Sequence, residues 1–245
     1  MKLLAFETAT EGCSVALWID GQVRERFELA PRRHAELSLP WAGELLAEAG
    51  IARSSLDAIA VGRGPGAFTG VRLAIAIAQG IALALDRPVV PVSTLAALAA
   101  SSLVETRRAA GIGGDQDDFV LAAIDARMGE VYSGTFRLQS GGAIEALGDE
   151  AVGAPGSVLL PEGELQWHGV GTGFAAEEGA LSARLQGRLL MVDASALPRA
   201  SAVARLGAAA FERGEAVDPD RVEPAYLRNN VALTIAEQQA LRAGR

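Results

Sequence analysis

Residues 61–72, VGRGPGAFTGVR, and the apolar run that follows them as far as Leu85 decide the fold of this chain. The apolar run 58–61 precedes the glycines and has the composition of a buried strand. Glycine accepts positive φ and close backbone approach, whereas proline stiffens a loop. The stretch therefore predicts a strand, a tight loop, and a helix from about residue 70 to Leu85 that Thr69 caps.

Two interpretations of the glycine loop stay open. The first turn of the following helix presents free N–H groups, which form a generic anion site. Alternatively, the loop is a tight strand-to-helix turn that needs glycine only for its backbone conformation. It is not a nucleotide-binding P-loop, because no Gly-Lys-Ser/Thr follows the glycines.

The helix after the loop is apolar all round, which indicates burial on every side. Gly70, Ala74, Ala78 and Ala82 recur every four residues and form one small-residue face. Such a face allows a second helix to come close, so we expect either a core helix or one packed against a partner. A membrane span is not expected, because polar residues interrupt the run and a bilayer needs roughly 20 apolar residues.

Composition limits the class of protein. The chain has 245 residues, 50% of them hydrophobic, and a net charge of −8. An acidic chain is poorly suited to holding nucleic acid alone, because phosphate contacts need clustered Lys and Arg. Cys13 is the only cysteine, which excludes a disulfide within the chain and fits a reducing compartment. No signal peptide opens the sequence, so we expect a soluble, cytoplasmic protein.

Strands and helices alternate along the chain, which predicts mixed sheets with helices packed on them. Residues 106–117 are polar and rich in glycine, and they predict a domain boundary. We expect a first α/β domain over 1–105, completed by a C-terminal helical region from about 199–245. A second, smaller domain is expected over 106–198.

Two further segments have a composition that suits phosphate. The turn at 7–12 offers the hydroxyls of Thr8 and Thr10, and a second glycine loop with Gly171 precedes an expected helix over about 174–185. Each segment is also an ordinary turn, so neither is specific. His34 has Ser38 at the i+4 position, which excludes a two-histidine metal site on that helix.

The sequence shows no nucleophile elbow and no Cys/His cluster. It therefore favours binding over catalysis. A second hypothesis is an actin-like small-molecule kinase or ATPase. In this hypothesis the turn at 7–12, the first glycine loop and the loop with Gly171 bind ATP or ADP together. Its candidate residues are Thr8, Thr10, Gly64, Gly66 and Gly171.

Four motifs carry a family resemblance. They are FETAT at 6–10, GRGPGAFTGVR at 62–72, DARMGEVY at 125–132 and PAYLR at 224–228. Together they resemble the TsaB family, also called YeaZ, over nearly the whole chain. Ala67 departs from the family, which usually has serine there; the change removes a hydroxyl but keeps the turn.

The resemblance implies the actin-like, sugar-kinase-like (ASKHA) fold with two similar α/β domains. It also implies a part in N6-threonylcarbamoylation of adenosine 37 in tRNAs. In that pathway the transferase TsaD holds a metal through a His-x-x-x-His helix, whereas this chain has only His34 in the matching helix. The implied role is a non-catalytic subunit with no metal site of its own.

The implied partners are TsaD and the ATPase TsaE, with tRNA bound only through the complex and no membrane involved. The chain alone is expected to form a homodimer or to remain a monomer. Any ATP or ADP would bind in the cleft or at the partner interface. Family members pair through helices of the first domain, and the expected interface residues here are His34, Leu37, Trp41, Gly70, Arg72, Ala74, Ala78 and Ala82.

Overall fold

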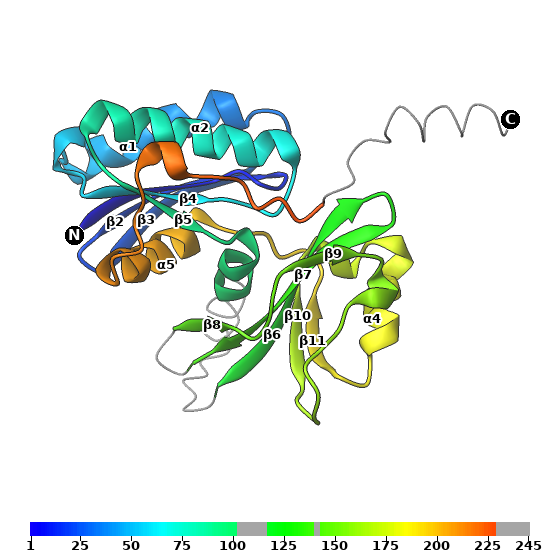
Figure 1. Cartoon of the computed structure of the whole chain (residues 1–245). Helices are drawn as coiled ribbons and strands as arrows, with labels where there is room; N and C mark the ends of the chain where they lie inside the picture. Colours follow the sequence, from blue (N-terminus) through cyan, green and yellow to red (C-terminus); the bar gives the residue numbers. More distant parts are fainter. Residues whose placement is uncertain (102–116, 140–142, 229–245) are drawn as a thin grey trace, which may run out of the picture.

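The computed structural model describes residues 1–101, 117–139 and 143–228. Two α/β domains, each built on one mixed sheet, lie side by side (Figure 1). This arrangement confirms the fold class that the sequence predicts.

The first sheet has the order β3-β2-β1-β4-β5. Its strands are β1 (Lys2–Glu7), β2 (Gly12–Ile19), β3 (Gln22–Leu29), β4 (Ala58–Gly62) and β5 (Val89–Val92). The first three strands form an antiparallel meander, and β4 and β5 run parallel to β1. Asp20 and Gly21 both have positive φ, 45° and 94°, as a tight two-residue hairpin loop requires.

Helices cover both faces of the first sheet (Figure 1). Helices α1 (His34–Ala49) and α2 (Phe68–Leu85) share one core with residues of β1, β2 and β4. Helix α5 (Ala200–Glu212) packs on the opposite face. Because α5 follows the second domain in the sequence, the chain returns to pack on the first sheet.

The second sheet has the order β11-β10-β6-β7-β8, with β9 paired to β7. Its strands are β6 (Asp118–Arg127), β7 (Glu130–Leu138), β8 (Ile144–Ala146), β9 (Ala151–Gly153), β10 (Trp167–Val170) and β11 (Leu189–Asp193). A helix that begins at Thr94 packs on one face, and α4 (Ala180–Leu185) packs on the other. The helix at Thr94 also contributes Ala97 to the core of the first domain, so it joins the two domains. The domain boundaries themselves stay a prediction, because residues 102–116 lie outside the described chain.

Two helix predictions differ from the structure. Helix α2 begins at Phe68, its N-cap is Ala67, and no side chain caps it, so Thr69 is not the cap. The predicted helix over 174–185 is reduced to α4, which follows two short 3-10 turns. Glu177 and Glu178 have positive φ there, and this conformation breaks the helix.

Helix α2 has the length and hydropathy of a candidate membrane span. In the fold, however, one side of it belongs to the core of the first sheet. The helix is therefore a core helix whose other side is unusually apolar.

Candidate functional site

The glycine loop lies directly on the turn between β1 and β2. The Ala67 N–H donates a hydrogen bond of 2.7 Å to the Ala9 carbonyl oxygen. A Cβ at Gly66 would lie 2.4 Å from that same oxygen, and a Cβ at Gly70 would lie 2.0 Å from the Thr8 carbonyl oxygen. These two glycines thus serve close packing of backbone on backbone, which favours the turn interpretation of the loop.

Glu7 is fully buried beneath this loop. Its carboxylate accepts hydrogen bonds from the Ala9 N–H at 2.8 Å and from the Thr94 hydroxyl at 2.9 Å. Thr94 Oγ1 in turn accepts the Gly64 N–H at 3.1 Å. Burial raises the pKa of Glu7 to about 7, although the hydrogen bonds from Ala9 and Thr94 oppose the rise. The carboxyl therefore ties together β1, the glycine loop and the helix at Thr94.

The five residues proposed for nucleotide do not converge on one cradle. The buried Thr8 hydroxyl donates to the Gly70 carbonyl oxygen at 2.7 Å, and Gly64, within the glycine loop, is buried. A Cβ at Gly171 would lie 2.3 Å from the Ala123 carbonyl oxygen, so this glycine too serves internal packing. Of the five, Thr10 and Gly66 line the cleft described next.

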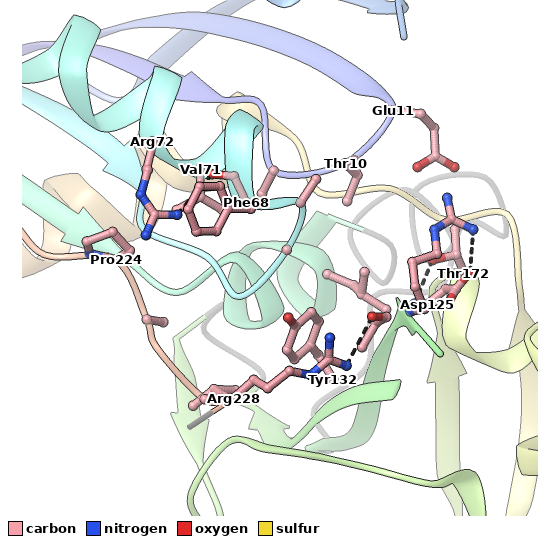
Figure 2. Close-up of a pocket in the computed structure, with 18 of the residues that line it drawn as sticks. Thr10, Glu11, Phe68, Val71, Arg72, Asp125, Tyr132, Thr172, Pro224 and Arg228 are labelled. Carbon is pink, nitrogen blue, oxygen red and sulfur yellow. Dashed lines mark hydrogen bonds and ion pairs between the residues drawn. The ribbon is translucent and has the colours of Figure 1, made fainter. Parts of the chain in front are cut away.

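A cleft of about 770 Å³ lies between the two domains (Figure 2). One wall comes from the glycine loop and the start of α2, including Phe68 and Arg72, and the opposite wall includes Asp125 and Thr172. The segment 224–228, which we call the strap, closes a further side. The cleft is therefore built from three parts of the chain that are distant in sequence.

The strap bridges the two domains. The Ala225 N–H donates to the Arg63 carbonyl oxygen at 2.8 Å in the first domain. Arg228 donates to the Ala126 carbonyl oxygen at 3.2 Å and forms an ion pair with Glu130 in the second domain. The width of the cleft therefore depends on the PAYLR motif at 224–228.

Arg72 contacts two aromatic side chains at the rim of the cleft. Its guanidinium carbon lies 3.3 Å from the centroid of Phe68 and 5.2 Å from that of Tyr226. It also donates a 2.9 Å hydrogen bond to the Tyr226 hydroxyl. No local pattern in the sequence predicts this cluster, because Arg72 and Tyr226 are 154 positions apart.

The tip of the β6–β7 hairpin faces the cleft and is held by Asp125. This carboxylate accepts the Arg127 N–H at 2.7 Å and its guanidinium at 2.7 Å. Arg127 and Met128 both have positive φ, 62° and 59°, a costly conformation for residues other than glycine. The ion pair is the turn salt bridge typical of such sequences, and it leaves the side chain of Met128 88% exposed.

The expected small-residue interface on α2 requires correction. Ala74, Ala78 and Ala82 are 0% exposed and belong to the core that α2 shares with the first sheet. The fourth member, Gly70, packs against the β1–β2 turn as described above. The face that they form is thus covered by the chain itself and is not open to a partner helix.

The opposite side of α2 is open. We call Phe68, Arg72, Ala76, Gly80 and Leu83 the outer stripe. Arg72 is half-buried and the other four are exposed, Phe68 by 66% and Leu83 by 67%. A Cβ at Gly80 would meet no atom within 4 Å. The outer stripe therefore combines apolar ends with a smooth, small centre.

Helix α1 lies beside α2 and carries the other expected interface residues. Leu37 and Trp41 are half-buried, and Leu39 between them is 54% exposed. His34 lies 2.9 Å through Nε2 from the Thr10 carbonyl oxygen, so it fastens α1 to the β1–β2 turn. Within residues 1–101, 117–139 and 143–228, no group of three His, Cys, Asp or Glu side chains is placed to hold a metal ion.

This architecture defines an actin-like protein of the TsaD type. The family model for TsaD, tRNA N6-adenosine threonylcarbamoyltransferase, matches residues 28–236. Within that class, the chain belongs to the TsaB (YeaZ) family. It is 41% identical to the tRNA threonylcarbamoyladenosine biosynthesis protein TsaB of Escherichia coli, over 95% of this chain and 96% of that one.

Other relatives agree with this assignment. The TsaB of Haemophilus influenzae is 37% identical over 94% of this chain and 95% of its own. The solved structure of YeaZ from Pseudomonas aeruginosa superposes with a TM-score of 0.79 at 44% identity, and it covers 92% of this chain and 99% of that chain.

Proposed function

We propose that this chain acts in the biosynthesis of threonylcarbamoyladenosine in tRNA, as a non-catalytic subunit that docks on a TsaD-type transferase. The part in biosynthesis follows from relatives of that name that match nearly the whole chain. TsaE is a further proposed partner, tRNA is reached through the complex, and the compartment is the cytoplasm.

The docking proposal is carried by the outer stripe of α2. Exposed Phe68 and Leu83 give this side an apolar character that a water-facing helix does not need. The small centre at Ala76 and Gly80 lets a helix of a partner come close. The same surface could pair with a second copy, so we propose a homodimer when the transferase is absent.

The non-catalytic role is supported by the chemistry of the loops. The hydroxyl of Thr8 and the glycines at 64, 70 and 171 are used in internal packing, so they do not cradle a phosphate. Glu7 is buried under the loop, not facing the cleft. The alternative, an actin-like kinase or ATPase, requires the cleft to hold ATP or ADP through Thr10 and Gly66.

Reconstitution tests the proposal. TsaD, TsaE and the threonylcarbamoyl-adenylate synthase are incubated with tRNA, with and without this chain. We expect modified tRNA only when the chain is present, and no ATP hydrolysis by the chain alone. Product in its absence, together with ATP turnover by the purified chain, would establish the kinase-like alternative.

The docking surface has its own test. Leu83→Arg places a charge in the outer stripe, whereas Leu159→Arg makes the same change at a leucine in the second domain that is 81% exposed. We expect Leu83→Arg to weaken binding to TsaD at least about tenfold, the usual loss for a buried apolar anchor, and Leu159→Arg to leave it unchanged. Equal affinities of the two variants, measured by calorimetry, would remove the outer stripe from the interface.

A further inference from the structure

We propose that the interdomain cleft binds an extended acidic peptide segment of a partner protein, with Arg72 as its carboxylate anchor. This inference goes beyond the proposed function, because it concerns a ligand of the cleft, and it stands whether or not the chain acts on tRNA. Phe68 and Arg72, at the start of the outer stripe, also line the cleft, whereas Ala76, Gly80 and Leu83 do not.

The lining of the cleft is positively charged, whereas the whole chain is negatively charged. Four arginines line it, at 32, 72, 127 and 228, against two carboxylates, Glu11 and Asp125, although the whole chain carries −8. Arg127 is paired with Asp125, and Arg228 is paired with Glu130. In the described chain Arg32 and Arg72 form no ion pair with a carboxylate, and Glu11 is the remaining acidic residue of the lining, so one net positive charge faces the cleft.

The side chain of Arg72 is restrained and still has N–H groups available to bind an anion. Its position over the Phe68 ring and two hydrogen bonds restrain the side chain, and the bonds to the Phe68 carbonyl and the Tyr226 hydroxyl use one N–H on each terminal nitrogen. The guanidinium has five N–H groups, so three remain available. A fixed fork of this kind binds a carboxylate with little loss of side-chain entropy.

The strap supplies an unpaired backbone edge. Among its residues Ala225 is tied to Arg63, whereas the N–H and C=O groups of Tyr226, Leu227 and Arg228 bond to no other group in the described chain. An extended peptide can satisfy such groups by pairing alongside, and this mode gives affinity that does not depend on side chains. This is the observation that favours a peptide over a small anion.

Apolar side chains at the mouth suit the side chains of a peptide. Phe68 is 66% exposed, Tyr226 is 60% exposed and Met128 is 88% exposed, and they come from three different segments. Aromatic residues, methionine and arginine are the types enriched where proteins bind one another, and methionine adapts to varied partners. The cleft volume of about 770 Å³ lies within the usual range for ligand pockets, so the cleft has room for part of a peptide.

The test is selection of peptides against the full-length chain. Random heptapeptides displayed on phage are panned on the immobilised protein, and enriched peptides are synthesised with a fluorescent label. Their affinities are measured by anisotropy for the native chain, for Arg72→Gln and Arg32→Gln, and for the control Arg205→Gln on the exposed side of α5. Arg32 is exposed and forms no hydrogen bond or ion pair in the described chain, so its variant tests the charge with little effect on the fold. Thermal unfolding of each variant is recorded.

We expect enriched peptides to carry Asp or Glu beside apolar residues. Arg72→Gln should weaken their binding at least about tenfold, as expected for loss of a charged hydrogen bond, Arg32→Gln should weaken it less, and Arg205→Gln should leave it unchanged. Enrichment without acidic residues overturns the proposal. It is also overturned if affinity is unchanged in both cleft variants, or if a twelve-nucleotide RNA displaces the peptides and depends on the same arginines.

Discussion

The two sides of helix α2 carry similar residues and have opposite environments. The inner side, Gly70, Ala74, Ala78 and Ala82, is pressed on the first sheet and the β1–β2 turn. The outer stripe also has a small centre, Ala76 and Gly80, yet it faces open space. Small residues on a helix therefore indicate close packing without saying whether the neighbour belongs to the same chain.

The inner side should tolerate added volume least. We expect Ala78→Leu to lower the free energy of unfolding by about 3 kcal/mol, because three extra carbons enter a packed core. Urea unfolding followed by circular dichroism measures the change.

The matched control is Ala76→Leu, two positions along the same helix on the outer stripe. It should change the free energy of unfolding by less than about 0.5 kcal/mol, while it weakens association with a partner. If the two variants unfold at the same urea concentration, the distinction between the sides of α2 is wrong.

Beneath the same loop, Glu7 makes stability depend on pH. Its pKa is about 7 in the fold against 4.5 for the free group, so the folded state binds the proton more tightly. The stabilisation is complete below about pH 4.5 and is lost as pH rises through 7. Between pH 5 and pH 8 this group alone should lower the free energy of unfolding by about 2.5 kcal/mol.

Glu7→Gln removes the titration and keeps the shape. The difference in free energy of unfolding between native and variant chains, measured from pH 5 to 8, should therefore follow one proton with a midpoint near 7. A difference that is constant across this range would mean that Glu7 stays charged throughout.

The sequence predicted the elements with strong local signals. The hairpin at Asp20-Gly21 and the strand–loop–helix unit follow from turn chemistry and hydrophobic periodicity, and the structure confirms them. The prediction that Thr69 caps α2 was wrong. The Ala67 N–H, at the start of the helix, donates to the carbonyl oxygen of Ala9, a residue 58 positions away in the sequence. Local propensity contains no information about such a contact.

The cleft was only partly predictable. The glycines at 64, 66 and 171 carry the signature of a phosphate cradle, but the same lack of a side chain permits close backbone packing, and the sequence cannot distinguish the two uses. The stack of Arg72 on Tyr226 depends on the path of the strap, which no periodicity encodes. What could be read from sequence was the motif PAYLR itself, without its role as a bridge.

The smallest expected effect on stability is at Gly80, on the outer stripe of α2, and there stability and association should change in opposite directions. Gly80→Ala should raise the free energy of unfolding of the monomer by about 1 kcal/mol, because alanine is the better helix former and nothing lies within 4 Å of the new Cβ. The same methyl group would separate a closely packed partner helix, so association should weaken while the monomer gains stability. Dilute urea unfolding and titration with TsaD measure the two quantities, and opposite signs would place the partner helix at Gly80. If both quantities rise, Gly80 lies outside the contact and the outer stripe binds only through its apolar ends.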